Sequence, residues 1–233
     1  MLMTPTRAVR RHAYVAPPRI ETAWLHELLQ SSKRRGDPKN IPLFYAGDLV
    51  LASLPCVSVV GTREATPEGR SRATRLAREL VKGGAVVVSG LARGIDTAAH
   101  ISAIENGGRT IAVIGTPLSR ASPVENAALQ ETIWRDFLLI SPFQDGRPVH
   151  AKNFPERNRV MAAISDATVI VEASDTSGTL HQAAECQQLG RWLFILRTAA
   201  ENPTVTWPKR FLGVKSSVVL DRTEQIFEAL NFR

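Results

Sequence analysis

From residue 57 onward, short apolar runs alternate with amphipathic stretches of helical length. Each run is rich in β-branched residues and apolar on nearly every position, which is typical of parallel strands covered on both faces. Strands are therefore predicted at 57–60, 85–88, 110–114, 137–140, 168–171 and 192–196. This alternation constrains the fold more than any other feature of the chain.

Helices are predicted between these strands. The stretch 67–84 carries Ala73, Leu76, Ala77 and Leu80 on one face and arginines on the other. Further helices are expected at 95–106, 124–134, 156–164, 180–189 and 223–230. Strands that alternate with helices through short connections form α/β folds. We expect a doubly wound, mostly parallel sheet with helices on both faces.

The amino-terminal segment differs in charge. Residues 1–40 hold eight Lys and Arg against three acids, so they supply +5 of the net +7. A short helix at 21–31 and a polar break before residue 41 divide the chain into a basic arm, 1–40, and a domain, 41–233. The arm is either a contact for nucleic acid or a solvated leader.

Several protein classes are not expected. No apolar stretch reaches the roughly 18 residues of a membrane span, and the start of the chain does not read as a secretory signal. Cys56, Cys186 and the five histidines show no metal-ligand spacing. We predict a soluble cytoplasmic protein without a metal or cofactor.

Glycine-rich and polar segments follow the ends of the predicted strands, where ligands bind in open α/β sheets. Ser89 and Gly90 come directly after a strand, Arg93 adds a positive charge, and Gly94 precedes a helix. The sequence at 177–179 repeats this device, which suits an anion. Neither segment matches a P-loop or a dinucleotide-binding fingerprint. The alternative is that each segment is an ordinary turn that caps a helix.

Two groups of side chains suggest chemistry. Asp96 and His100 lie four residues apart on one helix face, where they form an acid–base pair or, as we prefer, play structural roles. Phe154 stands near Lys152, Arg157 and Arg159, which suits a stacked base with flanking phosphates. The alternative places Phe154 in the core and pairs Arg157 with a carboxylate.

Four blocks of the sequence resemble the DNA-processing protein A family, also called DprA or Smf. They are VVGTREATPEG, VVVSGLARGIDTAAHISAIENGGRTIAVIGTPLSRASPVEN, FPERNRVMAAIS and VIVEASDTSGTLHQAAECQQLGR. The resemblance implies an extended Rossmann-like domain that binds single-stranded DNA, helps to load a RecA-type recombinase, forms homodimers and is not an enzyme. The helical and winged-helix domains usual in the family are not expected in this chain.

The resemblance also implies a site. The expected DNA-binding residues are Gly61, Thr62, Arg63, Ser89, Gly90, Arg93, Gly94, Lys152, Phe154, Arg157, Arg159, Ser177, Gly178 and Thr179. The residues expected to organise the pocket are Asp96, His100, Asn158 and Glu172. Ser141-Pro142 and Leu180-His181-Gln182 depart from the family pattern, which affects the details of two loops.

A nucleotide-binding or nucleotide-cleaving protein is the alternative. Residues 157–182 also resemble the lysine-decarboxylase-like phosphoribohydrolases, which carry a catalytic glutamate soon after a glycine-rich loop. Positions 180–184 of this chain contain no acid. Hydrolysis would therefore lack a general acid or base worth about 10²–10⁴-fold in rate.

Overall fold

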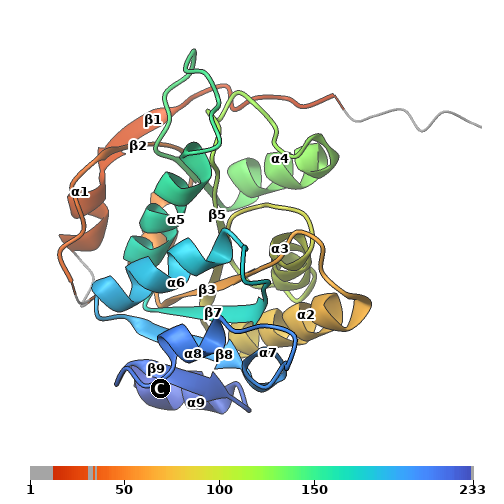
Figure 1. Cartoon of the computed structure of the whole chain (residues 1–233). Helices are drawn as coiled ribbons and strands as arrows, with labels where there is room; N and C mark the ends of the chain where they lie inside the picture. The colour runs from red at the N-terminus through yellow and green to blue at the C-terminus, as the bar shows by residue number, and fades with distance from the viewer. Residues whose placement is uncertain (1–12, 31–33, 35, 232–233) are drawn as a thin grey trace, which may run out of the picture.

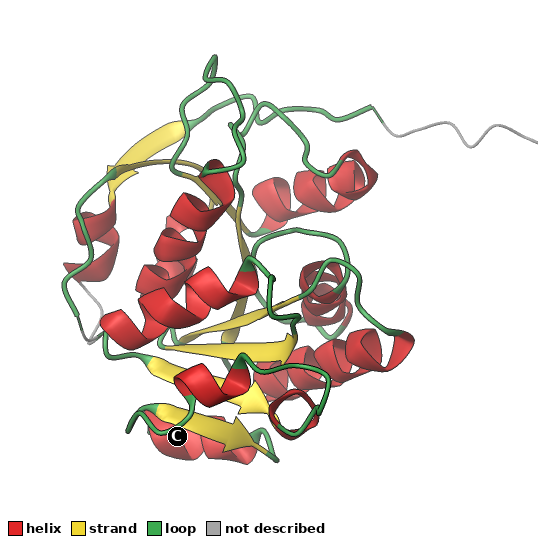
Figure 2. Cartoon of the chain, in the orientation of Figure 1, coloured by secondary structure: helices red, strands yellow, loops and turns green. Residues whose placement is uncertain are grey.

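A computed structural model describes residues 13–30, 34 and 36–231. These residues form one nine-stranded sheet in the order β1-β2-β6-β5-β4-β3-β7-β8-β9 (Figures 1 and 2). The strands are β1 (Glu21–Trp24), β2 (Pro42–Gly47), β3 (Cys56–Gly61), β4 (Val86–Ser89), β5 (Thr110–Val113), β6 (Leu138–Ser141), β7 (Ala167–Glu172), β8 (Trp192–Leu196) and β9 (Ser217–Leu220).

The strands from β3 to β9 are parallel to one another, as expected for consecutive apolar runs. From β3 the chain proceeds outward through β4, β5 and β6 and then returns to place β7 on the other side of β3. Strand order therefore reverses between β3 and β7, and the loops there diverge to opposite faces of the sheet. Such a switch point leaves a crevice at the carboxyl ends of the strands.

Helices cover both faces, which confirms the predicted fold class (Figure 1). One face carries α1 (Leu25–Gln30), α5 (Asn153–Ile164), α6 (Thr179–Gln188), α7 (Arg197–Ala200) and α8 (Pro208–Phe211). The other carries α2 (Pro67–Lys82), α3 (Ile95–Glu105), α4 (Ala127–Asp136) and α9 (Glu224–Leu230). Two short 3-10 helices are η1 (Leu49–Ser53) and η2 (Val124–Asn126). In the described part of the chain, no helix is both long and apolar enough to cross a bilayer.

The edges of the sheet differ from the sequence-based expectation. A helix was expected over residues 21–31, but the structure has β1 and then the shorter α1. Strand β1 pairs antiparallel with β2, so the expected boundary at residue 40 falls between two paired strands. Strands β2 and β9 were also not predicted. Residues 1–12, which carry Arg7, Arg10 and Arg11, lie outside the described residues.

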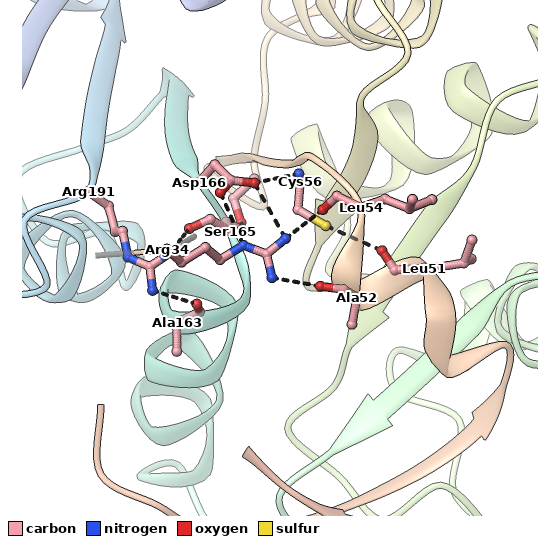
Figure 3. Close-up of polar contacts among 10 residues, drawn as sticks. Arg34, Leu51, Ala52, Leu54, Cys56, Ala163, Ser165, Asp166 and Arg191 are labelled. Carbon is pink, nitrogen blue, oxygen red and sulfur yellow. Dashed lines mark hydrogen bonds and ion pairs between the residues drawn. The ribbon is translucent and has the colours of Figure 1, made fainter. Parts of the chain in front are cut away.

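A buried arginine joins the amino-terminal segment to the sheet (Figure 3). The Arg34 side chain is 1% exposed and donates hydrogen bonds of 2.6 Å to the carbonyl oxygens of Ala52 and Leu54. Its Nε lies 3.2 Å from Oδ1 of Asp166, whose other oxygen accepts the N–H of Cys56 at 2.8 Å. Part of the segment expected to be a polar break is thus fastened to the amino-terminal end of the sheet.

Candidate functional site

A cavity of about 310 Å³ opens beyond the carboxyl ends of β3 and β7, at the switch point. Its lining comes from the loops after these strands and from α3, α5 and α6. The residues are Val60, Gly61, Thr62, Arg63, Glu64, Ala92, Asp96, Phe154, Arg157, Asn158, Met161, Ser174, Ser177, Gly178, Thr179 and Gln182. We call it the switch-point cavity.

A second cavity of about 370 Å³ lies beside it, toward the ends of β4 and β5. The two share a wall made by Arg63, Glu64, Ala92, Phe154 and Arg157. The rest of the second lining is Gly90, Arg93, Gly115, Ser122 and Pro123. We call it the β4–β5 cavity. Together the cavities bring most of the predicted residues to one rim of the sheet.

Arg63 and Phe154 form the exposed part of the shared wall. The guanidinium carbon of Arg63 lies 4.9 Å from the centroid of the Phe154 ring, a cation–π contact. Gly115 lies close to the ring, because a Cβ there would come within 2.8 Å of Phe154 Cδ1. The exposed Arg63 therefore covers the ring, so a flat ligand would stack on the guanidinium or displace it.

Arg157 forms the buried part of the wall and is 5% exposed. Its Nη1 donates to the carbonyl oxygens of Gly90 at 2.5 Å and Val113 at 2.6 Å, at the ends of β4 and β5. Burial lowers its pKa to about 10, which still leaves it charged at neutral pH. Among the described residues no carboxylate oxygen lies within 4.0 Å of it, but the charge of the buried Asp96 opposes this lowering of the pKa. Arg157 is a fixed cation beneath both cavities.

Asp96 and His100 do not form a working acid–base pair. Asp96 is buried in the wall of the switch-point cavity, and its Oδ2 accepts the N–H of Ala92 at 3.3 Å. Burial raises its pKa, and the charge of Arg157 opposes this shift. His100 lines neither cavity, since its Nδ1 lies 2.7 Å from the Thr110 hydroxyl inside the fold. Burial lowers its pKa to about 3. The geometry gives His100 a structural role.

The loop before α6 provides the far side of the switch-point cavity. Asn158 donates from Nδ2 to the carbonyl oxygen of Gly178 at 3.0 Å, which holds this loop against α5. The Ser177 hydroxyl accepts the N–H of Thr179 at 3.3 Å, at the start of α6. Hydroxyl groups and a helix amino terminus thus face the cavity, a combination that suits an anion.

At the start of α2, unlike the start of α6, a carboxylate of the protein itself binds the residue that caps the helix. The Glu172 carboxylate accepts the Thr66 N–H at 3.2 Å and the Thr66 hydroxyl at 2.8 Å. Glu172 lies in a third cavity of about 520 Å³, next to the switch-point cavity. Its negative charge stabilises the helix amino terminus where a dinucleotide-binding fold would hold a pyrophosphate. Glu172 therefore organises this edge and opposes a phosphate there.

Four of the predicted DNA-binding residues lie away from both cavities. Ser89 is buried and donates its hydroxyl to the Val59 carbonyl at 2.7 Å. Arg159 turns to the opposite side of α5, where its Nε pairs with Glu185 at 2.8 Å beside a separate cavity. Lys152 is exposed just before α5 and Gly94 caps α3, and neither lines the two cavities. Positions two apart on a helix face different ways, which separates Arg159 from Arg157.

The structure also adds residues that the sequence-based list lacked. Glu64 and Ala92 lie in the glycine-rich segments that follow two strand ends, so their place in the chain indicates them. Met161 and Gln182 come from the buried faces of α5 and α6. Their apolar and amide side chains give no signal that distinguishes them from core residues.

Comparison with known proteins gives a consistent result. A family model described as DNA recombination-mediator protein A matches residues 28–231. The chain is 40% identical over 154 residues to DNA processing protein DprA of Streptococcus pneumoniae, covering 66% of this chain and 54% of that protein. It is 33% identical over 191 residues to protein Smf of Escherichia coli, covering 82% and 51%. The chain thus spans about half the length of these relatives.

Solved structures show the same relationship. The X-ray structure of the Streptococcus pneumoniae protein aligns with a TM-score of 0.74 and 33% identity, covering 80% of this chain and 65% of that one. A structure of DNA processing protein A from Helicobacter pylori, described for its single-stranded DNA binding mode, aligns with a TM-score of 0.74 and 27% identity, covering 91% and 98%. A molybdenum cofactor carrier protein of Chlamydomonas reinhardtii, at 17% identity and a TM-score of 0.52, shares the fold alone.

Proposed function

The chain belongs to the DNA recombination-mediator protein A family, and from this membership and the two cavities we propose that it binds single-stranded DNA. The strand would lie along the carboxyl edge of the sheet, across the wall that the cavities share. The Helicobacter pylori relative, described for its single-stranded DNA binding, aligns over nearly all of its own length, which supports the proposal.

One observation carries the proposal. Arg63 is stacked on Phe154 in the wall that the two cavities share, and the buried cation Arg157 lies in the same wall. A base can stack on the exposed guanidinium face while its phosphates enter the cavities on either side. Every base has a π-face, so this mode of binding is tolerant of sequence.

The surrounding charges favour some paths for the strand over others. Arg93 extends from the β4–β5 cavity and is exposed, although it pairs with Glu125 at 2.5 Å. On the other side, Glu68 and Glu172 line the third cavity with one cation, Arg72, and with Glu64, which also belongs to the shared wall. Carboxylates repel a polyanion, so one end of the strand would run toward Arg93, and neither end would enter the third cavity.

The test is a titration of labelled oligothymidine at several salt concentrations. Arg63→Ala should weaken binding by about 1–3 kcal/mol, the value of one stacked base, and should flatten the salt slope by about 0.7. Arg159→Ala removes the same charge from the other side of α5 and is the matched control. Equal losses in the two variants would contradict the assignment of the site.

Further properties belong to the same proposal. We infer that the protein acts without catalysis in the cytoplasm, where it would help to place a RecA-type recombinase on the bound strand. A homodimer would present two strands at once. These inferences rest on family membership and concern the activity of a whole protein. The chain matches about half the length of the relatives.

A further inference from the structure

Positive charge is concentrated in one helix of the folded domain. The chain holds 29 Lys and Arg and 22 Asp and Glu, of which residues 1–40 hold eight and three. Helix α2 alone carries five cations and two acids. That leaves sixteen cations and seventeen acids for the rest of the chain. Beyond the amino-terminal segment, α2 therefore accounts for all of the excess positive charge.

Four of the five cations of α2 lie on the outer side of the helix, and the fifth, Arg72, lines the third cavity. Arg70, Arg75, Arg78 and Lys82 are all exposed, as are Ser71 and Thr74 between them. Successive positions advance by 100°, so these residues share one broad face of the helix. We call the four cations the α2 ridge. At a rise of 1.5 Å per residue, the ridge is about 18 Å long.

The cations of the α2 ridge form no close ion pairs, although Arg75 shares a cavity with Glu79, Asp221 and Glu224. Among the described residues, none of its four cations lies within ion-pair distance of a carboxylate. Of the two acids of α2, Glu68 stands in the first turn, and Glu79 accepts the Thr223 hydroxyl. Four adjacent exposed cations repel one another, so the ridge favours an external anion.

The ridge also begins at the candidate site. Helix α2 starts after Thr66, three residues beyond Arg63. Nη1 of Arg70 donates to the Ala65 carbonyl, which ties the first cation of the ridge to the loop that carries Arg63. A phosphate chain that leaves the shared wall beside Arg63 can therefore continue along α2.

The other side of α2 argues against a membrane as the partner. Ala73, Leu76, Ala77 and Leu80 are buried in the core against the sheet and α3. A helix that binds a lipid surface needs a free apolar face to insert among the headgroups. This helix offers only charge and hydroxyl groups, which suits the phosphates of a nucleic acid.

We propose that the α2 ridge binds the phosphates of the same DNA strand after it leaves the site. This inference rests on the proposed function and extends it. A strand would need to be long enough to reach both the site and the ridge in order to bind with full affinity. With phosphates about 3.4 Å apart in B-form DNA and farther apart in an extended strand, the ridge spans about three to five of them.

The experiment compares two oligothymidines, of about six and about twenty nucleotides, with the whole chain. In the double variant Arg75→Gln/Arg78→Gln, the long strand should bind about tenfold more weakly, and its salt slope should fall by about 1.4. The short strand, which is held at the site, should bind as it does to the wild type. Gln is a good helix former, and an unchanged unfolding midpoint would confirm that the fold is intact.

The matched control is Lys209→Gln/Lys215→Gln, which removes two exposed cations near α8, the helix on the other face of the sheet. It should leave both affinities unchanged. Undiminished binding of the long strand by the ridge variant would overturn the inference and leave the proposed function standing. The inference would also be overturned if the ridge variant lost as much affinity for the short strand as for the long one, or if the control variant lost as much affinity as the ridge variant. A loss by the ridge variant that is seen only with duplex DNA would overturn it too. If the wild type bound neither strand, both proposals would fail.

Discussion

Gly90 shows how tightly the candidate site is built around one buried charge. A Cβ at this position would come within 1.8 Å of Nη1 of Arg157. Only glycine allows the end of β4 to approach the guanidinium closely enough for the Gly90 carbonyl to accept its hydrogen bond. The glycine that the sequence suggested as a ligand contact is thus needed first by the protein itself.

Gly90→Ala should therefore destabilise the fold by about 2–4 kcal/mol, because it overpacks the site and displaces a buried hydrogen bond. Urea denaturation measures this loss. Gly178→Ala is the control, since a Cβ there has open space and the residue already has helical backbone angles, with φ −59°. A loss in the control as large as that of Gly90→Ala would contradict the explanation.

His100 makes the stability of the protein depend on pH. Unfolded, it takes up a proton below about pH 6.5, whereas burial lowers its folded pKa to about 3. The unfolded state binds more protons between these values, so stability is lost as pH falls through this window, by about 1.4 kcal/mol per pH unit.

Comparison of unfolding free energies at pH 7.5, 6 and 5 tests this dependence. The variant His100→Asn should lose stability less steeply toward low pH than the wild type, while Asp96 titrates in both proteins. His181→Asn, at an exposed position of α6, should keep the wild-type slope. A wild-type slope in His100→Asn would show that the acid sensitivity arises elsewhere.

At the scale of the elements, two carboxylates hold opposite ends of the sheet. Glu172 joins the end of β7 to the start of α2 and so shapes the rim of the site. Asp166, at the other end, joins the start of β7 to Arg34 and Cys56 (Figure 3). The amino-terminal segment is integrated through Arg34 as well as through β1.

Removal of Arg34 should loosen that connection. Arg34→Met removes the hydrogen-bond donor that the Asp166 carboxylate and the carbonyl groups of Ala52 and Leu54 share in the folded protein. The variant should lose about 3 kcal/mol in free energy of unfolding. Lys39→Met changes an exposed cation of the same segment and should cost little. The difference in urea midpoint between the variants is the measurement, and equal midpoints would contradict a structural role for Arg34.

At the scale of the whole molecule, the switch-point cavity has the size of a small-ligand site, and its few carboxylates are the groups that bear on nucleotide cleavage. Within the described residues, its carboxylates are the buried Asp96 and the exposed Glu64. Residues 180–184 at the start of α6 contain none. The described chain also gathers no cluster of three His, Cys, Asp or Glu residues that could hold a metal ion.

Incubation with nucleoside monophosphates should therefore release no free base above the uncatalysed level, as followed by chromatography. Binding of the nucleotides without cleavage is compatible with this expectation. Release of free base by the wild type would contradict the expectation. If Glu64→Gln abolished that release, Glu64 would be identified as a catalytic group.

The sequence by itself determined the parallel sheet, its helices and the edge at which the candidate site lies. Consecutive apolar runs such as 85–88 and the amphipathic stretch of α2 are local patterns, and they specify local structure directly. Strand ends follow from strand positions, so the segments at 61–69, 89–96 and 172–180 are predicted to lie at one edge, while Phe154 is indicated by its neighbouring cations and Arg63 by the family resemblance. Family motifs then indicated the kind of ligand.

Only the tertiary structure decided the pairing of β1 with β2, the burial of Arg34 and Arg157, and the separation of Arg159 from the site. Each depends on contacts between residues far apart in the chain. A charged side chain has the same sequence signature whether it faces solvent, pairs across a helix or holds two strand ends together. Its role is set by the groups that surround it, and these are brought together only when the chain folds.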